Sequence, residues 1–232
     1  MKTIGLLGGM SWESTLSYYR LLNEGVKARL GGFHSARICL VSVDFAEIEA
    51  FQRDGDWQRA GQALATAARQ VEAGGAQALV IATNTMHRVA DDIEAAIGIP
   101  LLHIADATGE ALDNDGVRRV GLLGTRFTME QAFYRQRLEE RFGIEVVVPD
   151  EAERVSLHEI IFDELVQGEI NPASRARFVS IIDTLAARGV EGVILGCTEI
   201  AMLVEQQHTA MPLYDTTALH VEAALAFALG DG

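Results

Sequence analysis

Short apolar runs alternate with longer amphipathic segments along the whole chain. Runs of strand length lie at 2–8, 37–43, 78–82, 100–104, 118–123, 144–148, 192–196 and around position 213. Segments of helical pattern lie at 12–30, 45–57, 58–72, 87–97, 128–142, 156–167, 172–188, 198–206 and 217–229. Alternation of this kind is typical of parallel sheets covered by helices on both faces, so the pattern predicts an α/β fold.

Three residues are expected to begin helices. Ser11 is expected to cap the helix that starts near Trp12, and Thr128 the helix that runs to about 142. Asn171 precedes Pro172, an arrangement typical of a helix with proline in its first turn.

The second half of the chain repeats the first. Residues 73–81 align without gaps to 187–195, residues 4–9 resemble 120–125, and residues 99–101 resemble 211–213. These landmarks keep one order at offsets of 114, 116 and 112 positions, which indicates a tandem duplication of a whole domain.

We therefore expect two pseudo-symmetric lobes, each a parallel sheet flanked by helices, with the active site in the cleft between them. The first lobe would span 1–115 and be joined by a C-terminal helix within 208–232, while the second would span 116–207. The expected crossover is the turn-forming cluster 113–116.

Composition narrows the possible functions. The chain has 232 residues, 49% of them hydrophobic, and a formal net charge of −14, which argues against nucleic acid or an anionic membrane as a partner. No apolar run approaches the length of a membrane span, and the N-terminal segment lacks a secretory signal pattern. We expect a cytoplasmic protein in which Cys39 is a buried, inert thiol not joined to Cys197.

The two repeated strands end in chemically active residues at matching positions. Cys197 follows the strand at 192–196, and Thr83 follows the strand at 78–82. In open α/β sheets ligands bind beyond the carboxyl ends of the strands. A helix N-terminus after Cys197 is expected to lower the pKa of its thiol, while Asn84, Thr85 and Thr198 would donate hydrogen bonds to a carboxylate.

Other candidate motifs carry weaker signals. The turn 8–11 after the first strand lacks the order of a dinucleotide-binding loop and has no Walker lysine, so close approach to a small ligand fits it better. His87 either orients a catalytic group or caps a strand, whereas His103 and His220 lie among apolar residues as core histidines do. No group of residues has the spacing of a metal site.

Taken together, the stretches 83–87, 196–199 and 4–10 resemble the aspartate/glutamate racemases over essentially the whole chain. The resemblance implies a racemase that needs no cofactor such as pyridoxal phosphate, acts on a small acidic amino acid and forms a homodimer. It implies that the substrate is lined by Met10, Gln52, Thr83, Asn84, Thr85, Thr125, Thr198 and Glu199.

The chain departs from this family at two points. Thr83 stands where the family usually has a cysteine, and the segment 165–167 before Gly168 lacks the lysine that many members carry there. The first departure affects symmetric two-base catalysis, and the second affects how the distal carboxylate is held.

Racemisation removes the α-proton from one face of the substrate and returns a proton to the other, so it needs an acid or base on each face. The resemblance implies that the cysteine of the second lobe acts on the L-enantiomer, so we expect Cys197 to take the α-proton from that enantiomer and Thr83 to protonate the opposite face. Two alternatives remain: a cysteine-dependent decarboxylase or cis–trans isomerase of the same superfamily, and a non-catalytic protein that binds small acids.

Overall fold

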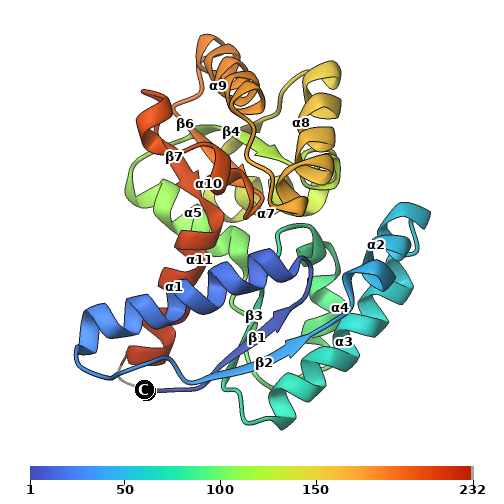
Figure 1. Cartoon of the computed structure of the whole chain (residues 1–232), viewed down its shortest axis with the longest axis vertical. Helices are drawn as coiled ribbons and strands as arrows, with labels where there is room; N and C mark the ends of the chain where they lie inside the picture. Colours follow the sequence, from blue (N-terminus) through green and yellow to red (C-terminus); the bar gives the residue numbers. More distant parts are fainter. Residues whose placement is uncertain (231–232) are drawn as a thin grey trace. The chain divides into compact units, whose positions relative to one another are not determined.

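The computed structural model describes residues 1–230, which form two compact units. Unit 1 comprises Met1–His103 and the described part of the chain from His220 onward, and unit 2 comprises Ile104–Leu219. Figure 1 shows a parallel sheet with its own helices in each unit. The predicted α/β fold with two parallel sheets flanked by helices is confirmed.

Unit 1 is built on a three-stranded parallel sheet of order β2-β1-β3. Its strands are β1 (Ile4–Gly8), β2 (Ile38–Ser42) and β3 (Ala78–Ile81). Its helices are α1 (Trp12–Leu30), α2 (Phe45–Asp54), α3 (Trp57–Ala73), the 3-10 turn η1 (Thr85–Val89), α4 (Ala90–Glu94) and most of α11 (Thr216–Leu229).

Alternating side chains of this sheet enter two separate cores. Ile4 and Leu6 of β1 point to the face covered by α1 and α11, while Leu7 points to the face covered by α2 and α3. In β3, Val80 joins the first core and Leu79 the second. Because both faces are covered, the strands are apolar without interruption, which is why the sequence shows runs rather than alternation.

Unit 2 has a four-stranded parallel sheet of order β5-β4-β6-β7 around one continuous core. Its strands are β4 (Arg119–Gly124), β5 (Glu145–Val147), β6 (Gly192–Gly196) and β7 (Leu213–Asp215). Its helices are α5 (Ile104–Asn114), α6 (Arg126–Glu130), α7 (Ala132–Phe142), α8 (Glu151–Asp163), η2 (Leu165–Gln167), α9 (Pro172–Ala187), α10 (Ile200–Leu203) and η3 (Gln206–His208).

Strand registers support the duplication. Ile4 pairs with Ala78 in unit 1, and the corresponding pair in unit 2 is Val120 with Gly192, which lie 116 and 114 positions later. The edge of each sheet also matches. Leu101 forms a bridge to Leu79 in unit 1, and in unit 2 the corresponding pair is Leu213 of β7 with Val193 of β6. The two units therefore share strand order and register along their common part.

Several predicted elements differ in detail. The 100–104 run forms only the isolated bridge of Leu101, because the chain enters α5 at once. Thr128 lies inside α6, which is capped instead by Thr125 three residues earlier. The helix expected at 156–167 begins at Glu151 with a capping box between Asp150 and Glu153.

Two of the expected caps are confirmed. The Ser11 hydroxyl accepts a hydrogen bond from the amide of Ser14 at 3.2 Å, and α1 follows. Asn171 accepts a bond from the amide of Ala173 at 2.9 Å, with Pro172 in the first turn of α9. Side-chain oxygens here satisfy amides that have no partner within the helix.

The division between the units falls at Ile104 rather than within 113–116. Helix α5 belongs to unit 2 because its buried face packs on α7. The Asp106 carboxylate receives two bonds from the Arg137 guanidinium at 2.6 and 2.8 Å, and Tyr134 donates to Thr108 at 3.1 Å. These contacts attach α5, and with it the turn at 113–116 that follows, to unit 2.

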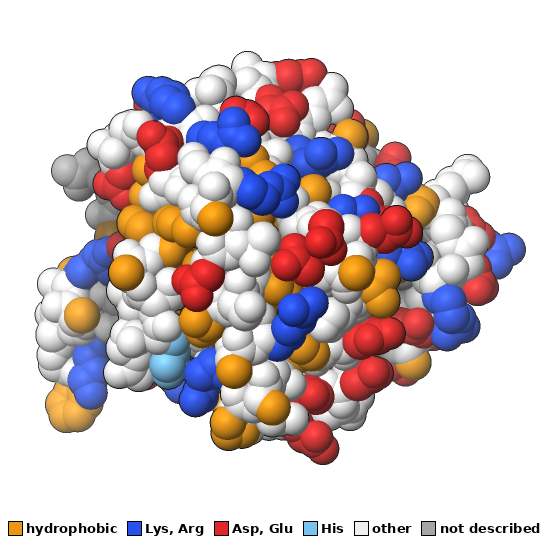
Figure 2. All heavy atoms as spheres, turned by 90° about the horizontal axis from the view of Figure 1, so that it is seen from above, with side chains coloured by type: hydrophobic (Ala, Val, Ile, Leu, Met, Phe, Trp, Pro, Cys, Tyr) orange, Lys and Arg blue, Asp and Glu red, His pale blue; other side chains and the backbone are white. Residues whose placement is uncertain are grey.

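Charge is mixed on the surface drawn in Figure 2, where Lys and Arg side chains lie among Asp and Glu side chains instead of forming a continuous basic area. Within residues 1–230, no helix has the length and apolar character needed to cross a bilayer.

Unit 1 also buries a polar group between α1 and α11. The Tyr18 hydroxyl lies 2.9 Å from Nδ1 of His220, and Nε2 of His220 lies 2.6 Å from the carbonyl oxygen of Leu102. A carbonyl oxygen only accepts, so Nε2 of His220 carries the proton and Nδ1 accepts from Tyr18. Burial lowers the pKa of His220 from 6.5 to about 4, so this ring is neutral at pH 7.

This buried histidine predicts acid sensitivity. Between pH 6.5 and about 4 only the unfolded chain protonates His220, so the stability contributed by burying the neutral ring is lost as the pH falls. The free energy of unfolding should fall by about 2–3 kcal/mol from pH 7 to pH 4.5 through this residue alone. Urea unfolding across this range measures it. His220→Phe should make the profile shallower by this amount and leave the slope that comes from the other buried histidine, His87, whereas His34→Phe, at an exposed position, should leave the profile as it is. A slope that His220→Phe does not change would contradict the assignment.

Candidate active site

In unit 2 the pairing of β4 with β6 brings two predicted site residues to one edge of the sheet. Gly124 pairs with Gly196, and the next residues along the two strands are Thr125 and Cys197. Thr125 is buried and uses its hydroxyl to accept the amide of Thr128 at 3.3 Å. The segments that begin with Thr125 and Cys197 therefore leave the sheet side by side.

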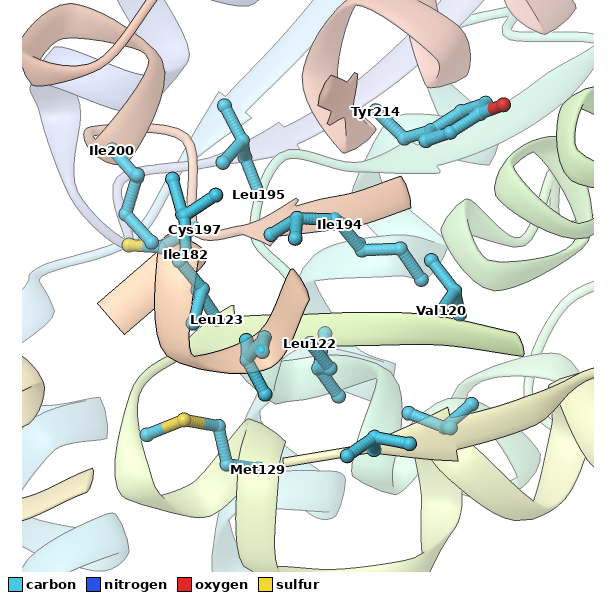
Figure 3. Close-up of a cluster of buried hydrophobic side chains, with 14 of the residues drawn as sticks. Val120, Leu122, Leu123, Met129, Ile182, Ile194, Leu195, Cys197, Ile200 and Tyr214 are labelled. Atoms are coloured by element: carbon cyan, nitrogen blue, oxygen red, sulfur yellow. The ribbon is translucent and has the colours of Figure 1, made fainter. Parts of the chain in front are cut away.

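Cys197 lies at the edge of the unit 2 core, as Figure 3 shows, with 9% of its surface exposed. Its thiol donates a hydrogen bond to Oε2 of Glu199, with Sγ and Oε2 2.9 Å apart. Glu199 and Thr198 are also buried. The chain turns directly after β6, which allows a side chain two residues ahead to reach back to the thiol.

The expected lowering of the thiol pKa is wrong. Burial raises the pKa of Cys197 well above its ordinary value, and the negative charge and hydrogen bond of Glu199 raise it further. Backbone amides of Glu199 and Ile200 act in the opposite direction but are outweighed. Helix α10 spans only Ile200–Leu203, so no long helix directs its N-terminus at the sulfur. The resting group is a neutral thiol beside a carboxylate.

In unit 1 the matching strand end carries Thr83. The amide of Ala82 bonds to the carbonyl of Leu7 at 2.9 Å, continuing the pairing of β3 with β1 beyond the last strand residue. Thr83 follows and is half-buried, whereas Asn84 and Thr85 are buried. Met10 leaves β1 at the same edge and is buried as well.

The side chain of Gln52 in unit 1 is held by a contact with the sulfur of Met86. Its side-chain amide lies 2.9 Å from the thioether sulfur of Met86, and both side chains are buried. The family resemblance predicts that Gln52 lines the substrate but gives no indication of this bond. The contact fixes the amide next to the turn that carries Thr85.

The glycines of the first turn are explained by packing within the protein. A side chain on Gly9, whose φ is +91°, would meet the carbonyl oxygen of Val43 at 2.2 Å. One on Gly8 would meet the side chain of Thr15 at 2.5 Å. Packing against Val43 and against α1 leaves no room for a side chain at either position. This packing accounts for the presence of both glycines without a ligand.

His87 lies in η1 and is buried. Its Nδ1 is 2.8 Å from the carbonyl oxygen of Thr83, and its ring centroid is 4.5 Å from that of His103 and 5.7 Å from that of His220. The prediction that His220 is a core histidine is confirmed, and His103 is buried too. The sequence leaves two roles open for His87, to orient a catalytic group or to cap a strand. In the structure its ring contacts the backbone of Thr83, which is a predicted catalytic residue.

Two further findings concern the chemistry available to the chain. Among residues 1–230, no set of three His, Cys, Asp or Glu side chains is arranged to hold a metal ion. Both cysteines are free thiols, and Cys39 is partly exposed rather than fully buried.

Comparison with known proteins gives the family. The model of the Asp/Glu/hydantoin racemases matches residues 7–224. A putative Asp/Glu racemase from Yersinia pestis is 55% identical, with a TM-score of 0.92 over 99% of this chain and 100% of that one. An aspartate racemase homologue from Pyrococcus horikoshii is 36% identical, with a TM-score of 0.86 over 99% of this chain and 100% of that one.

A curated relative, the broad specificity amino-acid racemase of Bacillus subtilis, is 21% identical over 93% of each chain. The fold of two parallel sheets defines the class, and the family match is more specific: this chain belongs to the Asp/Glu/hydantoin racemase family. Family membership and fold together support a racemase, which is an isomerase.

The contact between Cys197 and Glu199 yields a prediction about thiol reactivity. Glu199→Gln removes the negative charge that disfavours the thiolate, so the pKa of Cys197 should fall. Alkylation by iodoacetamide at a series of pH values, followed by peptide mass spectrometry, measures the shift. Cys39, resolved as a separate peptide, is the internal control; an unchanged profile for Cys197 would show that Glu199 does not act on the thiol.

Proposed function

We propose that this protein racemises acidic amino acids, L-glutamate and L-aspartate, without a cofactor, using Cys197 and Thr83 on opposite faces of the α-carbon. The observation that carries the proposal is the buried thiol of Cys197 bonded to the carboxylate of Glu199 at the end of β6. Thr83 supports it, because it comes shortly after β3, the strand that corresponds to β6 in the other unit.

The resting thiol needs a group that takes its proton before it can act as a base. In this proposal Glu199 takes the thiol proton, since its Oε2 already accepts the hydrogen bond from Sγ. The thiolate then takes the α-proton of the L-enantiomer, breaking a C–H bond and forming an S–H bond. The Thr83 hydroxyl delivers a proton to the opposite face and recovers one from water. Glu199 gives up the proton it took to the hydroxide this leaves, which completes inversion and restores the resting site.

The two groups are unequal in acidity. A thiol has an ordinary pKa of about 8.5, whereas an alcohol is a far weaker acid and a poor resting base. Thr83 suits the step in which a proton is donated to a carbanion, which is a strong base. The family's usual cysteine at this position would serve both directions, and its replacement makes the two faces of the reaction differ.

The substrate's charges need partners in a chain with a net charge of −14. In the proposal the carboxylates are bound by hydroxyl, amide and backbone donors at the two strand ends. The residues proposed to line the substrate are Met10, Gln52, Thr83, Asn84, Thr85, Thr125, Thr198 and Glu199. The Glu199 carboxylate only accepts hydrogen bonds, so it acts on the thiol and not on the substrate's carboxylates. The protein is expected to act as a homodimer, as its resemblance to this family implies, and in the cytoplasm, as the sequence pattern predicts.

The role of Cys197 is tested by Cys197→Ala. Loss of the acid–base group on one face should lower kcat for racemisation of L-glutamate and L-aspartate by about 10²–10⁴-fold. Chiral chromatography of the products measures it, and Cys39→Ala is the matched control that should retain activity. Undiminished turnover by Cys197→Ala would end the proposal, and release of carbon dioxide from malonates would favour the decarboxylase.

The role of Thr83 is tested by Thr83→Cys. A second thiol gives the opposite face a group that can act as both acid and base, so turnover starting from the D-enantiomer should rise and the two directions should become more alike. Initial rates from pure D-glutamate and pure L-glutamate measure this. An equal loss of activity in both directions, with the fold intact, would argue against a proton-transfer role for residue 83.

A further inference from the structure

The ring of His87 is fixed in one protonation form by its partner. Nδ1 lies 2.8 Å from the carbonyl oxygen of Thr83. A carbonyl oxygen can only accept a hydrogen bond, so Nδ1 carries the proton and donates it. The imidazole is neutral because burial lowers its pKa well below the ordinary value, helped by the neighbouring rings of His103 and His220.

The local backbone presents the Thr83 carbonyl to this ring. In an α-helical turn the amide of His87 would bond to the carbonyl four residues earlier, which belongs to Thr83. Here η1 is a 3-10 turn, and the amide of His87 bonds instead to Asn84 at 3.1 Å. The side chain of His87 bonds to the carbonyl that its own backbone amide does not reach.

In unit 2 the carbonyl of the corresponding residue, Cys197, has a different hydrogen-bond partner. The carbonyl of Cys197 accepts the backbone amide of Ile200 at 3.1 Å. The position that corresponds to His87, 114 residues later, is Ala201, whose side chain has no polar atom. A side-chain bond to the carbonyl of the reacting residue is therefore a feature of the Thr83 strand end and has no counterpart at the Cys197 strand end.

The ring itself is held on several sides. His103 and His220 pack against it, and His220 is in turn fixed by Tyr18 and by the carbonyl of Leu102. Leu102 is tied to β3, since its amide bonds to Leu79 at 2.9 Å. Packing and hydrogen bonds thus leave the imidazole little freedom to rotate away from Thr83.

We propose that His87 is a positioning residue for Thr83, holding the backbone of the strand end so that the hydroxyl delivers its proton along one fixed direction. The inference rests on the proposed function and deepens it. A weak acid gains more from fixed geometry than a thiol does, because its proton must move in a short-lived encounter with the carbanion. His87 touches the backbone of Thr83 and takes no part in the proton transfer itself.

Deuterated water separates the two half-reactions. Starting from L-glutamate, exchange of the α-proton in recovered L-glutamate reports Cys197, while formation of D-glutamate also requires Thr83. His87→Leu should lower the ratio of inversion to exchange by about tenfold or more, with KM little changed. A structural loss alone would reduce both rates together and leave the ratio where it was.

Three further variants sharpen the result. His87→Asn places an amide donor close to the position of Nδ1 and should restore most of the ratio, whereas His87→Gln, whose amide lies one bond farther out, should not. Tyr134→Phe removes a buried hydroxyl in unit 2 that is bonded to Thr108 and takes no part in the buried group around His87, so its ratio should equal that of the unaltered protein. Circular dichroism and thermal unfolding confirm that each variant is folded; should His87→Leu not fold, the Asn and Gln pair decides.

An unchanged ratio in folded His87→Leu would overturn the inference, and so would equal ratios for the Asn and Gln variants. A fall of the same size caused by Tyr134→Phe would show that the ratio follows any loss of a buried hydrogen bond and not the bond to Thr83. The proposed function fails separately: an unaltered protein that neither exchanges nor inverts either acid is not this racemase, and the inference falls with it.

Discussion

The parallel pairing of neighbouring strands determines where the polar residues of this chain meet. In unit 2, β4 and β6 end on the paired glycines Gly124 and Gly196, so the two residues that follow must emerge together. In unit 1, β1 and β3 run in the corresponding register. Helices on both faces keep these strands apolar and buried, which leaves their carboxyl ends as the place for polar chemistry.

The two strand ends began as copies and now carry different support. The thiol of Cys197 is paired with a carboxylate two residues ahead, while the backbone of Thr83 is paired with an imidazole four residues ahead. In the proposed mechanism the first arrangement controls the proton on sulfur, and the second fixes the direction of the Thr83 hydroxyl. Enantiomers have equal free energy, so kcat/KM must be the same in both directions, and the difference between the halves can appear only in partial reactions and in kcat and KM taken together.

The strands and long helices could be predicted from the sequence because buried parallel strands and amphipathic helices leave strong patterns. The duplication was visible in the repeated glycine and proline positions. The ends of elements were less predictable: Thr125 and Thr128 are both plausible caps, and only the backbone decides between them. The start of α8 was missed although Asp150 and Glu153 have the spacing of a capping box.

The sequence predicts the candidate site as a set of residues, but it does not predict the contacts that the structure shows between them. Cys197, Thr83 and Glu199 stand out because polar residues follow apolar strands. The raised pKa of the thiol was not foreseen, since it depends on how far Glu199 turns back and on how completely the sulfur is buried. The bond from His87 to Thr83 depends on a 3-10 turn that sequence patterns do not distinguish from an α-helical one.

The most direct test of the central claim compares α-deuterium uptake by pure L-glutamate and pure D-glutamate in deuterated water. Cys197 can lose its captured proton to solvent through Glu199 and return deuterium to the same face, so recovered L-glutamate should gain deuterium faster than it inverts. Thr83 is a reluctant base, so recovered D-glutamate should stay almost free of deuterium. Equal uptake by the two enantiomers before inversion would contradict the unequal roles of Cys197 and Thr83.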